Sequence, residues 1–365
     1  MGIKLYKELT PIISHYLLGI TELKIYDPEI IRLYSNESPL GPSPQAIEAY
    51  TKSYTEIHLY PDTMYTSLRS AIAKAHGLVA EYIICGAGIT ELLELIVRCF
   101  AVPGDEVLYS QYGFLMYPIM ALKAGATPIS APETNLRTDI NSILSYTTQN
   151  TKIVIIANPN NPTGSYITTE EMFTLRKKLP DDILLIIDNA YSEYVTQENF
   201  SDAIELVKQN SHNTIMLRTF SKIYGLAGLR LGWAYCDNSI IETLNTMKNP
   251  YSISSSAIEV GIAALKDTIH IENSLKHNST YLTWITEQLQ YIGLKVHPSV
   301  ANFVLVEFPL DPKKNAEQAD NYLKSNGIMI RNLERYTLGH CIRLSIGKKE
   351  DLEKTVQVLK EFMSF

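Results

Sequence analysis

The sequence predicts an α/β protein whose mostly parallel central sheet is flanked by helices and followed by a smaller α+β domain. Short apolar runs rich in β-branched residues alternate with amphipathic stretches between about residues 105 and 217, a pattern typical of parallel sheets covered by helices. This alternation stops near residue 251, where a long helical stretch begins. With 365 residues, the chain is long enough to bury a core in each domain.

We expect three segments in chain order. Residues 1–35 show no strong hydrophobic period and are interpreted as an N-terminal arm that joins the small domain, with the large domain at 36–250 and the small domain at 251–365. In the large domain the apolar spacing predicts strands at 106–110, 152–157, 183–187 and 214–217, and helices at 45–53, 64–76, 92–100, 114–125, 169–178 and 201–209. In the small domain it predicts a helical region at 253–289, strands at 301–307, 328–331 and 341–346, and helices at 316–326 and 349–363.

The composition excludes several classes of protein. Hydrophobic residues make up 45% of the chain and charged residues 19%, which indicates a globular protein and not a disordered one. A net charge of -7 with no compensating Lys/Arg run argues against a nucleic-acid surface. No apolar run approaches the roughly 20 residues of a membrane helix, so no membrane association is expected. The four cysteines are scattered and show no metal-site spacing with histidine, which favours a cytoplasmic protein with reduced thiols and no metal.

The functional hypothesis begins with the stretch Thr219-Phe220-Ser221-Lys222. This lysine follows the predicted strand at 214–217 and lies in a loop of small residues, with Arg230 eight positions later. A partly desolvated lysine amine attacks carbonyl carbons, and the Ser221 hydroxyl and Arg230 guanidinium suit a phosphate ester. Together these groups suggest pyridoxal phosphate, held as a Schiff base on Lys222. The alternative is a surface loop with a lysine and an arginine by chance.

Two further polar groups follow predicted strands. Asp188 ends the apolar run at 183–187, and a buried carboxylate needs a partner; a protonated pyridine nitrogen would supply one and would keep the ring an electron sink. The alternative is that Asp188 caps the next helix. Asn161 lies in a Pro/Gly-rich loop after the strand at 152–157, where its amide could donate to a phenolate oxygen.

The remaining candidates for cofactor contacts are a glycine-rich turn and a tyrosine. Gly86-Ala87-Gly88 precedes an apolar helix, and backbone N–H groups at the start of a helix attract anions. A simple tight turn is the alternative at this segment. Tyr112 follows the strand at 106–110, from where its ring could stack on a planar cofactor.

The motifs N-P-N-N-P-T-G, I-D-N-A-Y, T-F-S-K and G-L-A-G-L-R-L-G, in this order and spacing, resemble the fold-type I pyridoxal-phosphate aminotransferases. Among these, the chain is most similar to the histidinol-phosphate aminotransferase family. Further motifs that carry the resemblance are N-E-S-P-L-G-P-S-P, L-Y-P-D, G-A-G-I-T-E, P-G-D-E-V, A-N-F-V-L-V, G-I-M-I-R-N and I-R-L-S-I-G. Together they cover about residues 33–347.

The resemblance implies roles for individual residues. Lys222 would form the Schiff base and shuttle the proton, Asp188 would pair with the pyridine nitrogen, and Tyr112 would stack on the ring. The other implied cofactor contacts are Asn161 and Tyr191 at the phenolate oxygen, and Ala87, Gly88, Thr219, Ser221 and Arg230 at the phosphate.

The resemblance also implies a second subunit and a substrate pocket. Tyr60 would reach the cofactor phosphate of the other subunit, so a homodimer with shared active sites is expected. Arg343 would clamp the substrate α-carboxylate, while Arg331 and Tyr16 would line the distal end of the substrate. Because one carboxylate needs only one guanidinium fork, a second arginine suggests a phosphate on the substrate. The alternative for Arg331 is a surface pair with Glu334.

The implied activity is transamination from histidinol phosphate to 2-oxoglutarate by a ping-pong mechanism, a step of histidine biosynthesis. The amino donor and the 2-oxo acid acceptor would be the small-molecule partners. A threonine-phosphate decarboxylase-like lyase and an aromatic amino-acid aminotransferase are the alternatives from the same superfamily. A nonenzymatic ligand sensor is disfavoured, because no segment long enough for a DNA-binding domain precedes residue 36.

Overall fold

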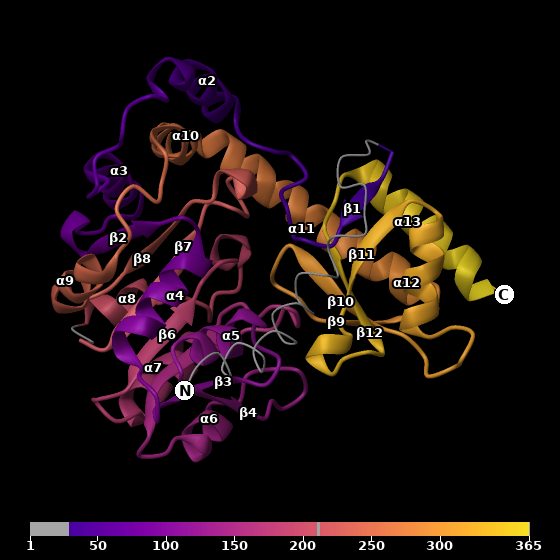
Figure 1. Ribbon diagram of the computed structural model, residues 1–365. Helices are drawn as coiled ribbons and strands as arrows, with labels where there is room; N and C mark the ends of the chain where they lie inside the picture. The colour runs from indigo at the N-terminus through magenta and orange to yellow at the C-terminus, as the bar shows by residue number, and fades with distance from the viewer. Residues whose placement is uncertain (1–28, 210–211, 365) are drawn as a thin grey trace, which may run out of the picture.

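The computed structural model describes residues 29–209 and 212–364 (Figure 1). Within them the chain forms two sheets, each with its own helices. The expectation for Tyr16 lies outside the described residues.

The larger sheet is mostly parallel, as the sequence predicts. Only β8 runs against its neighbours, whereas the pairs β3–β4, β3–β5, β5–β6 and β6–β7 are all parallel. All five residues of β6 are buried, as expected for a strand with helices on both faces. In spatial order the strands are β2 (Ile83–Gly86), β8 (Gly232–Tyr235), β7 (Thr214–Thr219), β6 (Leu184–Asp188), β5 (Thr151–Ala157), β3 (Glu106–Ser110) and β4 (Thr127–Ala131).

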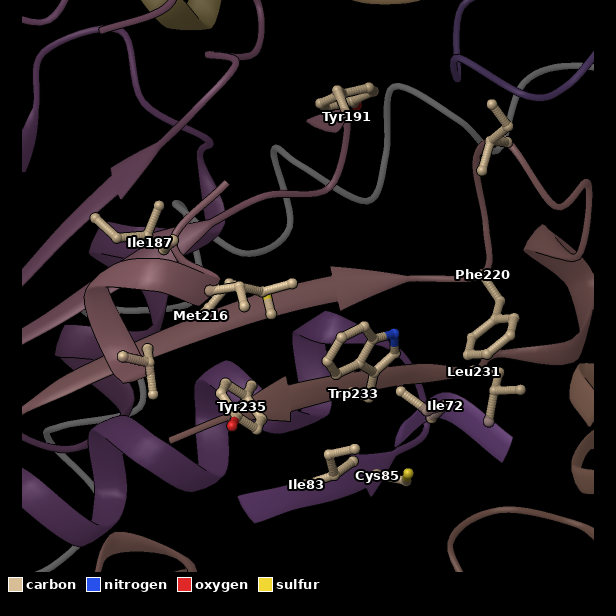
Figure 2. Packing of buried hydrophobic residues seen from close by; sticks show 14 of the residues in the cluster. Ile72, Ile83, Cys85, Ile187, Tyr191, Met216, Phe220, Leu231, Trp233 and Tyr235 are labelled. Atoms are coloured by element: carbon tan, nitrogen blue, oxygen red, sulfur yellow. The ribbon is translucent and has the colours of Figure 1, made fainter. Parts of the chain in front are cut away.

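Helices cover both faces of this sheet and form two apolar cores with it. In Figure 2, Met216, Phe220, Trp233 and Tyr235 share one face. This face is covered by α2 (Pro44–Ser53), α3 (Thr66–His76), α6 (Ile140–Tyr146), α7 (Thr169–Lys178), α8 (Ile204–Lys208) and α10 (Ser255–Lys266). The opposite face is covered by α4 (Ile89–Phe100), α5 (Met116–Lys123) and α9 (Asn238–Met247).

The local sequence explains why these helices form and where they pack. The buried residues of α4 are Ile89, Leu92, Leu93, Ile96 and Val97, which repeat at the spacing of a single helical face. Burying each such side chain contributes roughly 1.5–3 kcal/mol. This face therefore holds α4 on the sheet and brings the start of the helix to the carboxyl end of β2.

The smaller sheet is formed by β1 (Ile31–Leu33), β11 (Ile328–Asn332), β12 (Cys341–Ser345), β10 (Phe303–Glu307) and β9 (Lys295–His297), in that spatial order. Its core includes residues of α11 (Thr268–Tyr291), α12 (Ala316–Ser325) and α13 (Lys349–Ser364). Figure 1 shows α11 running from α10 toward this sheet. Since β1 pairs with β11, the end of the predicted N-terminal arm lies on the smaller sheet. The residue at which one domain ends and the next begins stays a prediction.

The structure differs from the predicted elements in identifiable ways. The helical region expected at 253–289 is two helices, because Asp267 ends α10 and its carboxylate caps α11 by accepting from the His270 N–H. The strands β1, β2, β4, β8 and β9 and the helices α6 and α9 were not predicted. Of these strands, β1 and β9 have three residues each, and β4 contains Pro128 and Ser130. Short 3₁₀ turns occur at Tyr54–Glu56, Ala80–Tyr82, Ser192–Tyr194, Ala227–Leu229 and Glu334–Tyr336. None of the helices in residues 29–209 and 212–364 is long and apolar enough to cross a membrane.

Candidate functional site

The candidate site is organised by the carboxyl ends of neighbouring strands in the larger sheet. Asp188, the last residue of β6, is opposite Ala157, the last residue of β5. Thr219, the last residue of β7, is opposite Gly232, which also pairs with Gly86 at the end of β2. Ligands of open α/β sheets bind at this edge. The predicted groups on the loops after β2, β3, β5, β6 and β7 therefore share one edge.

Lys222 lies three residues beyond β7 in a half-buried position. Its Nζ donates to the Ser35 carbonyl oxygen at 2.9 Å and lies 5.6 Å from the centre of the Tyr191 ring. Burial, and then the positive charge of Arg343, lower the pKa of this amine from 10.5 to about 7. A substantial fraction of the amine is therefore neutral, and so nucleophilic, near neutral pH.

Asp188 is buried and has a donor on each carboxylate oxygen. The Tyr117 hydroxyl donates to Oδ2 at 2.9 Å, and the Ala190 N–H donates to Oδ1 at 3.1 Å. Burial raises the pKa of the carboxyl group from 3.8 to about 6, with both hydrogen bonds and Lys222 acting in the opposite direction. A cationic ring nitrogen is a partner that would stabilise the ionised form of such a group.

An anion cradle lies where Arg230 meets the start of α4. The Arg230 guanidinium lies against Gly88, so that a Cβ at Gly88 would overlap it. The same guanidinium is 3.5 Å from the Ser221 hydroxyl, and the Thr219 hydroxyl accepts from the Ser221 N–H at 3.1 Å. No side chain caps the N-terminus of α4. Two hydroxyls, a guanidinium and the helix dipole suit a phosphate group.

The Ala87 N–H has a hydrogen-bond partner that the sequence did not predict. Its N–H donates to the Glu91 carboxylate at 2.5 Å, and the Ser252 hydroxyl donates to the same oxygen at 3.0 Å. The Ala87 amide, which we expected at the cofactor phosphate, thus has an acidic partner within α4. The Gly88 N–H also has a partner, the Gly86 carbonyl oxygen at 2.7 Å, but Gly88 itself lies against Arg230 and so borders the cradle.

Asn161, in the loop after β5 of the larger sheet, contacts Arg343 on β12 of the smaller sheet. The Arg343 guanidinium, on β12, donates to the Asn161 Oδ1 and to the Tyr34 carbonyl oxygen, the latter at 2.6 Å. Arg343 is buried and lies over the Phe303 ring at 5.2 Å. The guanidinium predicted to bind a carboxylate is therefore fixed beside the Asn161 loop.

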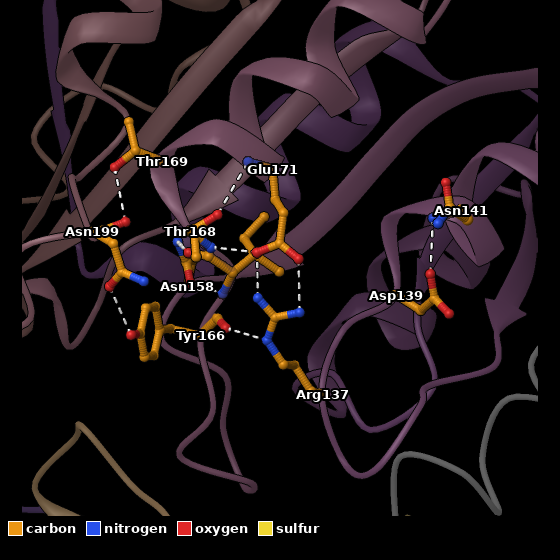
Figure 3. Close-up of polar contacts among 10 residues, drawn as sticks. Arg137, Asp139, Asn141, Asn158, Tyr166, Thr168, Thr169, Glu171 and Asn199 are labelled. Carbon is orange, nitrogen blue, oxygen red and sulfur yellow. Dashed lines mark hydrogen bonds and ion pairs between the residues drawn. The ribbon is translucent and has the colours of Figure 1, made fainter.

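A polar network beyond this loop fixes its course (Figure 3). Asn158 exchanges two hydrogen bonds with the Ile167 backbone, at 2.9 and 3.2 Å. Thr168 and Glu171 form a capping box that starts α7. Arg137 pairs with the Glu171 carboxylate and donates to the Tyr166 carbonyl oxygen at 2.7 Å. These contacts fix the backbone on both sides of Asn161.

Arg331 lies on β11 directly opposite Arg343 on β12. Opposed residues of an antiparallel pair lie on the same face of the sheet, with Cβ atoms about 5 Å apart. Among the described residues no ion pair joins Arg331 to Glu334, which was the alternative role for this arginine. The two predicted substrate arginines are therefore neighbours on the same face of the smaller sheet.

The structure also locates the predicted tyrosines. Tyr191 packs edge-to-face on Phe303 and its ring faces the Lys222 amine. Tyr112 is half-buried at the same sheet edge, after β3. Tyr60 is 81% exposed within this chain and stacks on Tyr251 at 4.5 Å.

Three residues of the site were not predicted. Asn36 is buried and its amide donates to the Tyr191 hydroxyl at 3.0 Å, and Tyr117 contacts Asp188. Glu133 accepts from the Ser110 hydroxyl at 2.6 Å and from the Tyr112 N–H at 3.2 Å, which ties down the loop that carries Tyr112. The N-E-S-P motif contains Asn36, and this was the only available signal; nothing local distinguishes Tyr117 or Glu133.

Comparison with known proteins places this geometry in a family. The family model for aminotransferase class I and II matches residues 28–359. A histidinol-phosphate aminotransferase from Paramagnetospirillum magneticum is 48% identical over 351 residues, 96% of each chain. One from Maricaulis maris is 43% identical, over 94% of this chain and 98% of its own. The crystal structure of the Sinorhizobium meliloti histidinol-phosphate aminotransferase in complex with pyridoxal-5'-phosphate superposes with a TM-score of 0.85 at 26% identity, covering 94% of this chain and 99% of that one. The chain belongs to the aminotransferase class I and II family.

Proposed function

We propose that this protein is a pyridoxal-phosphate-dependent aminotransferase that moves the amino group of histidinol phosphate to 2-oxoglutarate. Support comes from the two bacterial relatives of that name, which match nearly the whole chain, and from the composition of the site. The observation that carries the substrate assignment is the direct pairing of Arg331 with Arg343 beside the Asn161 loop.

The residues present fit the cofactor. Gly88, Ser221, Thr219 and Arg230 would hold its phosphate, since only a residue without a Cβ lets the guanidinium lie against the start of α4. Asp188 would hold the ring nitrogen. Tyr112 would stack on the ring, and Asn161 and Tyr191 would hold the phenolate oxygen.

When bound, pyridoxal phosphate supplies an electron sink for the negative charge that forms at the substrate α-carbon. The carboxylate of Asp188, being buried, keeps a proton on the ring nitrogen. The Lys222 amine, with a pKa of about 7, can accept the proton from the α-carbon and return it at neutral pH. The role of Lys222 needs the neutral amine that its surroundings favour. The role of Asp188 needs the ionised carboxylate, which Tyr117, the Ala190 N–H and Lys222 favour against the effect of burial.

The two paired arginines suit the anionic group of the substrate. Histidinol phosphate carries a phosphate near its amino group where an amino acid carries a carboxylate. A dianionic phosphate has oxygens for two guanidinium forks, whereas a carboxylate is satisfied by one. We infer that Arg343 serves both substrates of the ping-pong cycle and that Arg331 serves the phosphate.

Replacing Arg331 tests this substrate assignment. Arg331→Ala should lower kcat/KM for histidinol phosphate by about 30- to 150-fold, the loss of one charge-assisted hydrogen bond of roughly 2–3 kcal/mol. Turnover of an unphosphorylated donor such as phenylalanine should hardly change. Arg331→Lys, which keeps the charge but loses the fork, should fall in between.

Equal losses with both donors would remove the case for a phosphorylated substrate. Product analysis provides a second control. Transamination keeps the carbon skeleton, whereas release of carbon dioxide from threonine phosphate would identify the alternative lyase.

We further propose that the protein is a cytoplasmic homodimer. An apolar surface runs over α2, the 3₁₀ turn at Tyr54–Glu56 and the loop that follows; Tyr54, Ile57 and Tyr60 are 70%, 71% and 81% exposed. Monomeric proteins rarely expose contiguous apolar surface of this kind. The four cysteines are free thiols, three of them buried, which suits a reducing compartment.

A further inference from the structure

Tyr117 is held against Asp188 by its surroundings. It is fully buried on α5, and its hydroxyl donates to the Asp188 Oδ2 at 2.9 Å. The Phe114 ring meets it edge-on at 6.0 Å and 88°. Gly113 lies under the ring, since a Cβ at that residue would come within 3.1 Å of the Tyr117 Cδ2. The phenol therefore has little room to move away from the carboxylate.

The Asp188 carboxylate has its second fixed donor on the other oxygen. The Ala190 N–H donates to Oδ1 at 3.1 Å, from the turn that follows β6. Two donors from separate elements define the plane and the direction of the carboxylate. Each oxygen has capacity for a further hydrogen bond beyond these.

We propose that Tyr117 is a positioning residue for Asp188: its hydroxyl fixes the orientation of that carboxylate and keeps it ionised in a dry environment. The use of this ionised carboxylate rests on the proposed function, whereas the interaction itself does not. An Asp188 that became neutral could no longer hold a proton on the ring nitrogen of the cofactor.

The groups around Asp188 and Tyr117 shift their pKa values in the directions that this role requires. Burial raises the pKa of Asp188, and the Tyr117 hydroxyl is the largest of the opposing effects, followed by the Ala190 N–H and Lys222. Burial, Asp188 and the neighbouring hydroxyls of Tyr336 and Tyr191 raise the pKa of Tyr117 well above 10. Tyr117 therefore stays protonated at any working pH and always acts as the donor.

The simpler role for Tyr117 is core packing, because it belongs to the apolar core under α4 and α5. Tyr117→Phe separates the two roles, since it keeps the ring and removes only the hydroxyl. If Tyr117 only fills space, the ionisation of Asp188 should not respond to this change. If it is a positioning residue, Asp188 should bind its proton at a higher pH.

The test is an infrared titration of the cofactor-free protein, following the carbonyl stretch of protonated carboxyl groups. Subtracting the same titration of Asp188→Asn isolates the signal of Asp188. We expect Tyr117→Phe to raise the titration midpoint by about one pH unit, the size expected for losing a hydrogen bond to a charged group. Tyr235→Phe, which removes the hydroxyl of another buried tyrosine, on β8, is the matched control and should leave the midpoint unchanged.

A second variant keeps the test decisive should Tyr117→Phe fold poorly. A monofluorinated tyrosine at position 117 retains the ring and has a more acidic hydroxyl, so it should move the midpoint downward. An unchanged midpoint in either variant would overturn the proposal. A shifted midpoint supports the proposal. Measuring the affinity for pyridoxal phosphate as a function of pH then tests whether the ionised Asp188 carboxylate binds the cofactor. If the midpoint shifts but this affinity profile does not follow, Tyr117 still positions Asp188, and the proposed pairing of Asp188 with the ring nitrogen fails.

Discussion

At the scale of single residues, the chemistry depends on how the fold changes the properties of Lys222. A lysine in water holds its proton to pH values far above neutrality. Here burial, Arg343 and Arg230 disfavour the charged form, while Glu37 and Asp188 favour it, and the pKa of the amine falls to about 7. The same arginines that would attract an anionic substrate therefore activate the nucleophile.

The first prediction concerns the pH at which this amine reacts. In cofactor-free protein, acylation of Lys222 followed by mass spectrometry should reach half its maximal rate near pH 7. Arg343→Gln removes a positive charge and should move that midpoint upward. A midpoint near 10, the ordinary value for lysine, would show that the amine is solvated.

The same shift has a consequence for stability. Between about pH 7 and 10.5 the unfolded chain holds a proton on Lys222 that the folded protein has lost. Stability therefore rises with pH across this window, because the unfolded state binds more protons. Urea unfolding of the cofactor-free protein should show this rise, and Lys222→Met should lack it. Identical slopes in both proteins would contradict the lowered pKa.

At the scale of elements, Asn36 connects the two sheets at the site. Its backbone N–H donates to the Ser345 hydroxyl on β12 at 2.9 Å, and that hydroxyl donates back to the Asn36 Oδ1 at 2.9 Å. Asn302, just before β10, donates to the Asn36 carbonyl oxygen at 3.0 Å. The Asn36 amide in turn holds the Tyr191 hydroxyl. Asn36 therefore couples the smaller sheet to the loop that follows β6.

The backbone of Asn36 is left-handed, with φ of 56°, and this allows a matched pair of variants. Asn36→Gly keeps that conformation and loses the side-chain hydrogen bonds, which should lower the free energy of unfolding by about 2–3 kcal/mol. Asn36→Ala loses the same bonds but keeps a Cβ at positive φ, so it should be less stable than Asn36→Gly by about 1 kcal/mol. Urea unfolding measures both. Equal stabilities of the two variants would contradict the left-handed backbone.

The sequence could predict the parts of the fold and site that depend on contacts close in sequence, and not those that depend on contacts between distant residues. Asp188 and Lys222 were predictable because each follows a short apolar run, and a run with its terminal polar group is a local signal. The contacts of Asn36 with Ser345 and of Tyr117 with Asp188 join residues 309 and 71 positions apart. A single sequence has no local pattern that records such pairs.

Local patterns also do not reveal contacts made by single acidic side chains. The apolar spacing continues through Asp267, but its carboxylate caps α11 and divides the helical region. Ala87 was expected to offer its N–H to a phosphate, and the Glu91 side chain, one turn into α4, occupies that donor. In both cases a single acidic side chain satisfies a backbone N–H, which hydrophobic periodicity does not reveal.

At the scale of the whole molecule, the exposed position of Tyr60 fits a role across a subunit interface. Within its own chain it stacks on Tyr251 and is 81% exposed. The apolar surface around it extends over the 3₁₀ turn at Tyr54–Glu56. We therefore expect each site of the dimer to need Lys222 from one subunit and Tyr60 from the other.

Mixing two inactive variants tests this sharing. Lys222→Ala and Tyr60→Ala proteins should each have little activity, and mixed dimers should contain one complete site. Random exchange at equal amounts should restore about a quarter of wild-type activity, because half of the dimers are mixed and half of their sites are whole. Lack of rescue, with subunit exchange confirmed by native mass spectrometry, would place Tyr60 outside the partner's site.

The most direct test of the central claim is a half-reaction of the cofactor-loaded protein with histidinol phosphate alone. Without a 2-oxo acid, the absorbance of the bound cofactor should convert fully to that of its amino form, with one product molecule formed per site. Adding 2-oxoglutarate should reverse the spectrum, and Lys222→Ala should not convert at a comparable rate. A protein that leaves histidinol phosphate unchanged, while another amino donor converts the cofactor, would contradict the assignment.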